Sequence, residues 1–140
     1  MEIRLDGRVA LVTGASKGIG QAIAAEMAAA GASVMLSSRK EDGLRAAAAS
    51  ITPTGGAEID VFAANAGDPE AAAACAAATV ERFGGLDILV NNAAIQNVKP
   101  VSETSEAEWA EIIAVNLTSV FLGIKYAIDD NAVEVKMGIE

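Results

Sequence analysis

Residues 13–20 read Thr-Gly-Ala-Ser-Lys-Gly-Ile-Gly and come directly after the apolar run 9–12. An apolar strand that ends in glycines and continues into a helical pattern is typical of the phosphate-binding turn of a dinucleotide fold. Gly14 permits a tight turn, Gly18 removes a side chain where a pyrophosphate approaches the backbone, and Gly20 lets the helix pack close to the strand. The first helical turn leaves backbone N–H groups unpaired, and they face the ligand together with the positive end of the helix dipole. The alternative is a plain strand–helix connection.

The residues that end the second apolar run indicate which dinucleotide is preferred. In dinucleotide folds an acidic side chain at this place binds the ribose 2′-hydroxyl and selects NAD. Here the place is taken by Ser38, followed by Arg39 and Lys40. A guanidinium binds a phosphate through two parallel hydrogen bonds, and Lys17 in the glycine turn adds a second positive charge. The sequence therefore predicts NADP(H) as the preferred cofactor and NAD(H) as the alternative, unless the two cations are only the solvated start of a helix.

The composition indicates one globular domain and argues against several classes of function. The chain has 140 residues, of which 52% are hydrophobic and 21% charged. Its net charge of -9 argues against a nucleic acid or an anionic membrane as a partner. One cysteine and no histidine exclude a metal site built from those residues. We find no apolar stretch that is long enough to span a bilayer and no signal peptide, so a cytoplasmic, reducing location is expected.

Apolar runs alternate with helical patterns along the chain. Strands are expected at residues 9–12, 33–37, 59–63 and 86–90. Helices are expected from the glycine turn to Gly31, at 39–51, from Pro69 to about Arg82 with Asp68 as its cap, and at 105–128 with a Ser105–Glu108 capping box. In the first helix the spacing of Ile19, Ile23 and Met27 marks the apolar face. This alternation predicts an α/β fold with a three-layer, Rossmann-type parallel sheet in the order 3-2-1-4.

Three motifs at compatible spacing resemble the classical short-chain dehydrogenase/reductase family. The turn at residues 13–20 looks like the cofactor turn of that family. Asn91-Asn92-Ala93-Ala94 looks like its Asn-Asn-Ala-Gly motif, with Ala94 in place of the glycine. Val115-Asn116-Leu117 looks like the segment that holds its helix asparagine. The resemblance covers residues 5 to 128, which is nearly all of this chain but only the N-terminal half of a typical family subunit.

The resemblance implies a set of binding roles. Basic residues at the positions of Lys17 and Arg39 imply NADP(H). Asn65 and Ala66 are placed beside the adenine ring, with a polar loop residue as the alternative role for Asn65. An asparagine after the fourth strand either ties neighbouring strand ends together or touches the nicotinamide ribose. The expected cofactor-binding residues are Gly14, Ser16, Lys17, Gly18, Ile19, Gly20, Ser38, Arg39, Lys40, Asn65, Ala66, Asn92, Ala93 and Ala94.

The catalytic set of that family is not found in this sequence. Its chemistry is hydride transfer between a nicotinamide and a carbonyl or alcohol, and it uses a serine, a tyrosine and a lysine four residues after the tyrosine. Tyr126 is followed at that spacing by Asp130, and no serine follows Ser119. Asn116 matches the asparagine that positions a water in the proton relay of the family, and the alternative is a satisfied core asparagine. We therefore expect the chain to be inactive on its own.

Residues 1–128 are expected to form the dinucleotide-binding domain and residues 129–140 a divergent tail. Within the tail, 132–137 alternates apolar and charged residues, which predicts an edge strand beside 86–90, with a frayed terminus as the alternative. Family oligomers commonly pair through the last long helix, so a homo-oligomer through helix 105–128 is expected. Three functions stay open: the cofactor-binding half of an NADP(H)-dependent oxidoreductase, a non-catalytic nucleotide-binding module, and a dimeric scaffold.

Overall fold

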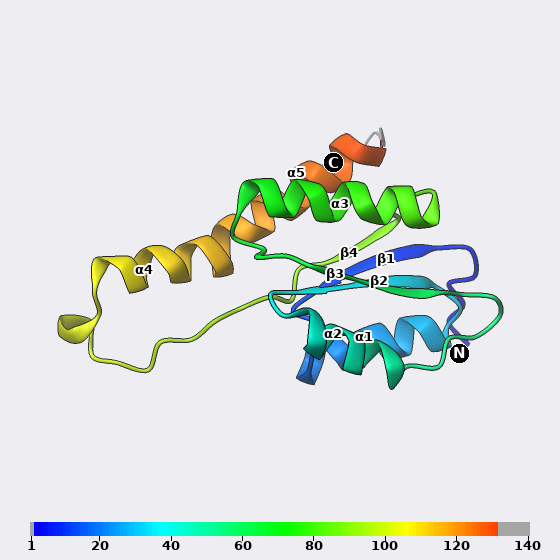
Figure 1. The fold of residues 1–140 in the computed structure, drawn as a ribbon, viewed down its shortest axis with the longest axis horizontal. Helices are drawn as coiled ribbons and strands as arrows, with labels where there is room; N and C mark the ends of the chain where they lie inside the picture. Colours follow the sequence, from blue (N-terminus) through cyan, green and yellow to red (C-terminus); the bar gives the residue numbers. More distant parts are fainter. Residues whose placement is uncertain (1, 132–140) are drawn as a thin grey trace.

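Four short apolar runs form a parallel sheet in the computed structural model, which describes residues 2–131 (Figure 1). The strands are β1 (Val9–Thr13), β2 (Ser33–Ser38), β3 (Ile59–Ala63) and β4 (Ile88–Val90). Their order in the sheet is β3-β2-β1-β4, which confirms the predicted order. Val12 lies opposite both Leu36 and Val90, so the carboxyl ends of the three neighbouring strands β2, β1 and β4 meet at one edge.

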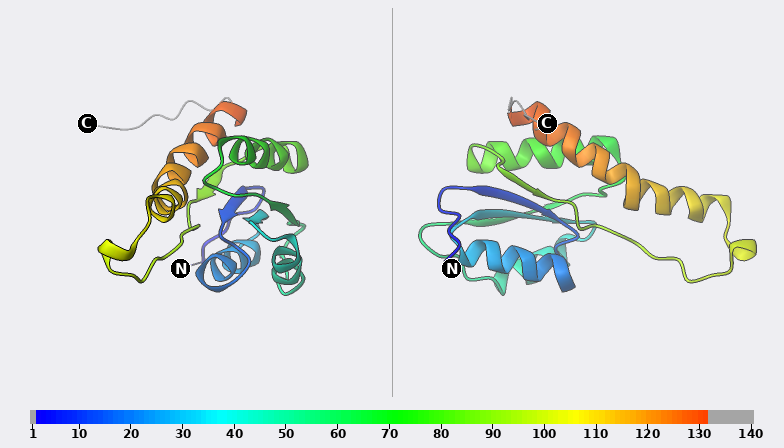
Figure 2. Two further views of the ribbon diagram at one scale, coloured as in Figure 1. Left: turned by 60° about the vertical axis from the view of Figure 1, so that its left-hand side comes forward. Right: turned by 180° about the vertical axis from the view of Figure 1, so that it is seen from behind.

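Helices cover both faces of the sheet (Figures 1 and 2). One layer consists of α1 (Gly18–Ala29) and α2 (Glu41–Ala49), and the other of α3 (Pro69–Phe83) and α5 (Ser119–Asn131). Successive strand residues point to opposite faces, so Val12 joins the core with α1 and α2, whereas Leu11 joins the core with α3. Because both faces are covered, the strands are continuous apolar runs, as parallel strands usually are.

The buried face of α1 differs from the predicted one. Ile19 has 74% of its surface exposed, and the buried residues of the helix are Gly20, Ala24 and Ala28. A Cβ added to Gly20 would lie 2.4 Å from the carbonyl oxygen of Gly14, so the helix backbone approaches the end of β1 too closely for any side chain. Small residues therefore form the inner face, and the larger apolar residues are displaced to its margin.

The predicted helix boundaries hold where capping groups set them. Asp68 caps α3 by accepting a hydrogen bond from the Glu70 backbone N–H at 3.0 Å, and Gly84 ends that helix with a φ of 84°. The short 3-10 helix η1 (Val101–Glu103) follows the loop after β4. Ser105 then begins α4 (Glu106–Ile113) with the predicted capping box.

The last long helix is interrupted by a π-helical segment that the sequence pattern did not predict. This segment, η2 (Ala114–Thr118), joins α4 to α5, and α5 continues through Asn131. Residues 129–131, the first residues of the predicted divergent tail, are helical and belong to α5. The predicted edge strand at 132–137 lies outside the described residues.

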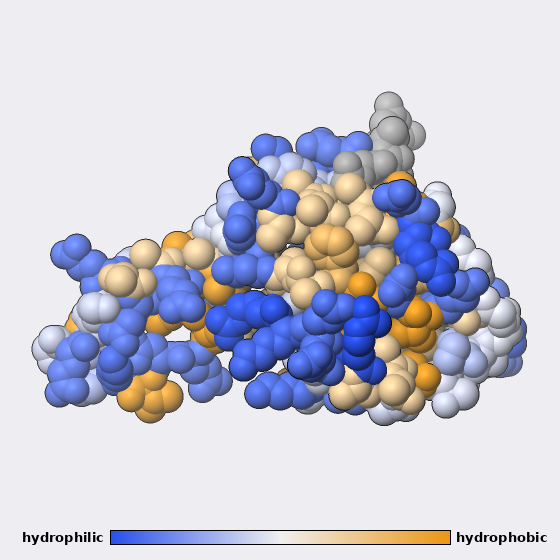
Figure 3. Space-filling model, viewed as in Figure 1, coloured by the Kyte–Doolittle hydropathy of each residue, from blue (hydrophilic) through white to orange (hydrophobic). Residues whose placement is uncertain are grey.

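The α4 end of this helix projects away from the sheet, as both views show (Figures 1 and 2). Large apolar side chains are exposed along the projecting arm (Figure 3) and on α5: Trp109, Leu117 and Phe121 each have 62–64% of their surface exposed. The helix Glu106–Asp129 is long and apolar enough to cross a membrane by length and composition, with a mean hydropathy of 1.5 over an 18-residue window, which corrects the expectation that no such stretch exists. One helix of this kind is weak support for a membrane span.

The close approach of α1 to β1 is testable by adding one methyl group. Gly20→Ala should lower the free energy of unfolding by about 1–3 kcal/mol, because its Cβ meets backbone that cannot move aside. Gly43→Ala in α2 is the matched control, since an added Cβ there meets its nearest atom, the Ser16 Cβ, at 3.4 Å. It should raise stability by about 0.5–1 kcal/mol, because alanine is the better helix former. Urea unfolding measures the free energy of unfolding of both variants. An unchanged free energy in Gly20→Ala would contradict the close packing of α1 on β1.

Candidate functional site

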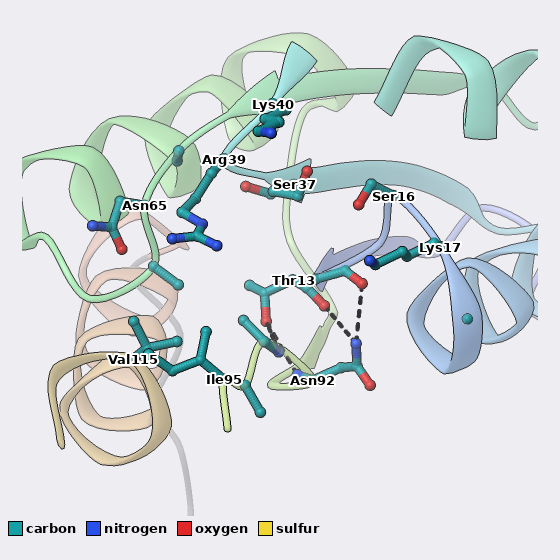
Figure 4. A pocket seen from close by; sticks show the side chains of 17 residues that line it. Thr13, Ser16, Lys17, Ser37, Arg39, Lys40, Asn65, Asn92, Ile95 and Val115 are labelled. Atoms are coloured by element: carbon teal, nitrogen blue, oxygen red, sulfur yellow. Dashed lines mark hydrogen bonds between the residues drawn. The ribbon is translucent and has the colours of Figure 1, made fainter. Parts of the chain in front are cut away.

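A cavity of about 530 Å³ opens at the carboxyl ends of β1, β2 and β4 (Figure 4). The right-handed crossovers of a parallel sheet bring the loops after these strands to the same edge, where ligands of such sheets bind. Most of the predicted cofactor residues line it: Gly14, Ser16, Lys17, Gly18, Ser38, Arg39, Lys40, Asn65, Ala66, Asn92, Ala93 and Ala94. Ile19 and Gly20 are not among the lining residues, and Gly20 packs against the Gly14 backbone instead. Sequence reasoning missed Thr13, Ser37, Ala64, Ile95 and Val115.

The glycine turn combines close packing on one side with open space on the other. Gly14 has a φ of +65°, and an added Cβ would lie 2.9 Å from the Ala93 Cα. Gly18 has a φ of +60°, and an added Cβ would meet nothing within 4 Å. Lys17 precedes α1 and makes no side-chain capping bond, so no side chain of the cap covers the first N–H groups of the helix. The turn therefore presents backbone donors to the cavity.

Asn92 and Thr13 fasten this turn to the end of β4. The Asn92 Nδ2 group donates to the carbonyl oxygens of Thr13 at 3.1 Å and Gly14 at 3.2 Å. The Thr13 Oγ1 atom accepts from the backbone N–H groups of Asn92 and Ala93, both at 3.1 Å, and donates to the Val90 carbonyl oxygen at 3.3 Å. Of the two roles predicted for the asparagine, the structure contains the tie between strand ends.

The two neighbouring asparagines point in different directions. A Cβ added to Gly123 would lie 2.7 Å from the Asn91 Oδ1 atom, so the Asn91 side chain faces α5. The Asn92 side chain faces β1 and the glycine turn instead (Figure 4). The Asn-Asn pair therefore connects β4 both to the first strand and to the last helix.

Cations gather where β2 ends. Lys17, Arg39 and Lys40 line the cavity, and no carboxylate is among the lining residues in the described part of the chain. The Arg39 side chain extends toward the cavity (Figure 4), and its Nη1 atom lies 3.7 Å from the Glu111 Oε1 atom on α4. The Ser38 hydroxyl oxygen is buried and has no hydrogen-bond partner within residues 2–131. A buried hydroxyl without a partner is costly, so this group fits a polar ligand in the cavity.

Asn65 combines a loop role with a place on the cavity wall. Its Oδ1 atom accepts a hydrogen bond from the Gly67 backbone N–H at 3.0 Å, which closes a tight turn after β3. A Cβ added to Gly67 would lie 2.9 Å from the Ala114 backbone, so this turn packs against η2. The turn therefore holds Asn65 and Ala66 at the rim between β3 and the long helix.

Asn116 is exposed, which contradicts the alternative role of a core asparagine. Its side chain is exposed, and its Oδ1 and Nδ2 atoms pair with the backbone N–H and carbonyl oxygen of Ile95, each at 2.8 Å. The widened turn of η2 changes the direction of the side chains that a regular helical repeat would bury. Asn116 thus ties the loop after β4 to the helix, beside the lining residues Ile95 and Val115.

Other chemically active side chains lie outside the cavity lining. Tyr126 is half-buried on α5, and the Lys125 Nζ atom lies 5.3 Å from the centre of its ring. Cys75 is buried in α3, and burial raises the pKa of its thiol, which makes it a poor nucleophile. Residues 2–131 therefore place neither a tyrosine nor a thiolate at the cavity.

A capping carboxylate holds the loop before α4. Glu108 accepts hydrogen bonds from Lys99 and from the Ser105 backbone N–H, and these contacts, with that of Lys99 the largest cause, lower the pKa of Glu108 from 4.5 to about 2. A depressed folded-state pKa means that the stabilisation is present above the unfolded value and is lost as the pH falls through about 2.

A pH titration of the native protein, monitored at the Glu108 carboxyl carbon by carbon-13 NMR, should therefore show a midpoint near pH 2. Lys99→Gln removes the largest cause and should move the midpoint toward the ordinary value of 4.5. A midpoint near 4.5 in the unmodified protein would show that Lys99 and Ser105 do not hold this carboxylate in solution.

The hydrogen bonds of the Thr13 hydroxyl predict that replacing Thr13 lowers stability most where the hydroxyl is lost. Thr13→Val should lower the free energy of unfolding by about 1–3 kcal/mol, because the Ala93 N–H group loses its acceptor. Thr13→Ser keeps the acceptor and should lose clearly less. Chemical unfolding compares the two variants, and equal losses would mean that the methyl group, not the hydroxyl, stabilises this edge.

Comparisons with known proteins give the same fold and a common family. The family model of short chain dehydrogenases matches residues 8–135. D-threitol dehydrogenase of Mycolicibacterium smegmatis is 40% identical over 121 residues, which cover 86% of this chain and 46% of that protein. The crystal structure of a short chain dehydrogenase from Burkholderia cenocepacia in complex with NADP is 35% identical, with a TM-score of 0.85, and the match covers 91% of this chain and 52% of that one.

A second solved structure extends the comparison. L-sorbose reductase from Gluconobacter frateurii, complexed with NADPH and L-sorbose, is 31% identical with a TM-score of 0.86, over 93% of this chain and 49% of that one. The present chain thus spans about half the length of the relatives that it matches.

Proposed function

This chain belongs to the short-chain dehydrogenase family, and we propose that its cavity binds NADP(H), with the adenosine 2′-phosphate beside Arg39. The observation that carries the proposal is the charge at the end of β2. There Arg39 and Lys40 line the cavity, Lys17 adds a charge from the glycine turn, and the lining within residues 2–131 contains no carboxylate. A carboxylate at this place would favour an unphosphorylated ribose, whereas a guanidinium favours a phosphate.

The rest of the dinucleotide fits the glycine turn. The backbone N–H groups at the start of α1 would hold the pyrophosphate, and the open space beside Gly18 admits it. The buried, unpartnered hydroxyl of Ser38 would bind the ribose. Asn65 and Ala66 would lie beside the adenine ring at the other wall. Relatives solved with NADP or NADPH support this assignment.

The electrostatic contrast between the cavity and the whole chain also supports the proposal. The chain carries a net charge of -9, which by itself repels a dinucleotide phosphate. Lys17 and Lys40, which line the cavity, form no ion pair within residues 2–131, so their charge is free to attract an anion. The adjoining hollow between the glycine turn and α2 contains two carboxylates, Glu41, which is paired with Arg45, and Asp42, and neither lines the cavity itself.

For the whole protein we propose hydride transfer to a carbonyl or from an alcohol, in which a bound nicotinamide would donate the hydride in its reduced form or accept it in its oxidised form. This chain would hold the cofactor, and Asn116 would serve as the relay position beside Ile95. The serine, tyrosine and lysine of the family are not placed at the cavity within residues 2–131, so we expect no turnover by this chain alone. A homo-oligomer through the apolar face of α4 and α5, in a reducing cytoplasm, belongs to the same proposal.

Two alternative functions make different predictions for binding. A non-catalytic nucleotide-binding module would bind NADPH tightly without turnover in any context. A dimeric scaffold would form a stable dimer and bind no nucleotide. The exposed side chains of Trp109, Leu117 and Phe121 favour the dimeric scaffold only if the cavity binds no nucleotide.

Reversing the charge at Arg39 tests the cofactor assignment. Arg39→Asp should weaken NADPH binding by about 2 kcal/mol or more, roughly thirtyfold, because the phosphate loses a charged partner and meets a carboxylate. NADH, which has no 2′-phosphate, should change far less. Isothermal titration calorimetry on the full chain measures the affinities for NADPH and for NADH.

Arg45→Asp is the control for that experiment. It makes the same change of charge on α2, and Arg45 is not among the cavity-lining residues. It should leave the ratio of NADPH to NADH affinity almost unchanged. Equal losses for both nucleotides in Arg39→Asp would end the assignment of the 2′-phosphate to this residue.

A further inference from the structure

The cation assigned to the phosphate already has a partner. Arg39 follows β2 and Glu111 lies on the projecting helix α4, yet their Nη1 and Oε1 atoms are 3.7 Å apart. The two side chains are 60% and 59% exposed. The distance exceeds that of a hydrogen bond, and both groups are solvated, so the pair is weak and easily exchanged.

Glu111 is distinguished from the other acidic groups near the cavity. Glu41 is paired with Arg45 on its own helix, Asp42 lines the adjoining hollow beside Lys17 and Lys40, and Glu108 belongs to the capping box and to Lys99. Within residues 2–131, Glu111 forms an ion pair with Arg39 and with no other cation. Among the three cations that line the cavity, Arg39 is in turn the one with an acidic partner in the described chain.

A bound phosphate and Glu111 would require the same guanidinium. Arginine binds a phosphate through two parallel hydrogen bonds, and a solvated carboxylate at 3.7 Å provides less than that. The phosphate therefore displaces the carboxylate. The displaced Glu111 stays on α4 close to the anion, where like charges repel each other.

We propose that Glu111 is a specificity-determining residue that competes with the 2′-phosphate for Arg39 and lowers the affinity for phosphorylated adenosine relative to unphosphorylated adenosine. This inference rests on the proposed function, because it takes Arg39 as the phosphate ligand. It adds a group from outside the cavity lining, contributed by a different element. The same exchange releases one of the contacts that join α4 to the sheet, since the pair links the end of β2 to that helix.

The test uses adenosine 2′,5′-bisphosphate and adenosine 5′-monophosphate, which differ only in the 2′-phosphate and do not reach the nicotinamide end. Glu111→Gln should bind the bisphosphate about three- to tenfold more tightly than the unmodified chain, with the monophosphate changed less than about twofold. Glu111→Ala should show the same gain, because the effect requires loss of the charge. Calorimetry at low and high salt should show the gain shrink as salt screens the carboxylate.

Glu106→Gln is the matched control, since it removes an acidic group from the exposed first turn of the same helix. It should leave both affinities unchanged, and circular dichroism should show equal helix content in all variants. If Glu111→Gln and Glu111→Ala bind the bisphosphate no better than the unmodified chain, the inference is overturned and the proposed function stands. If neither the unmodified chain nor any variant binds the bisphosphate, the proposed function and this inference are both overturned.

Discussion

The hydrogen bonds around Thr13 hold the candidate site in place. Its hydroxyl oxygen accepts two backbone N–H groups from the segment after β4, and the Asn92 amide returns two hydrogen bonds to the segment after β1. Each segment satisfies polar groups of the other that neither could satisfy alone. Because the glycine turn and the Asn-Asn-Ala-Ala segment are joined in this way, the position of one fixes the position of the other. The cavity lies between these segments and the end of β2.

Much of this arrangement could be predicted from the sequence, because local rules determine it. The strand order follows from short apolar runs alternating with helices, and the starts of α3 and α4 follow from Asp68 and Ser105. The cavity residues could be predicted because the loops after neighbouring parallel strands must meet at one edge. In each case a residue type and its spacing are enough, without knowledge of distant contacts.

Other features depend on tertiary packing that no local pattern encodes. The apolar spacing of Ile19, Ile23 and Met27 suggested the buried face of α1, but the close approach to β1 leaves room only for Gly20, Ala24 and Ala28. A core position was one of two roles left open for Asn116 because a regular helical repeat places it on the apolar stripe, and the π-helical turn in η2 changes that repeat. The pair between Arg39 and Glu111 joins elements that only the folded chain brings together.

The small residues between α1 and the sheet determine how the protein tolerates amino-acid replacement. Ala10, Ala24, Ala28 and Ala32 are fully buried, so little volume can be removed at these positions. In most cores the harmful replacements are truncations that leave a void. Here the backbones are so close that enlargement is the harmful direction, and each added methylene would push a helix away from the strands. Variation during evolution would therefore be restricted to residues of the smallest size on the inner face of α1, while the opposite layer, with Phe62 and Phe83, could exchange side chains of similar volume.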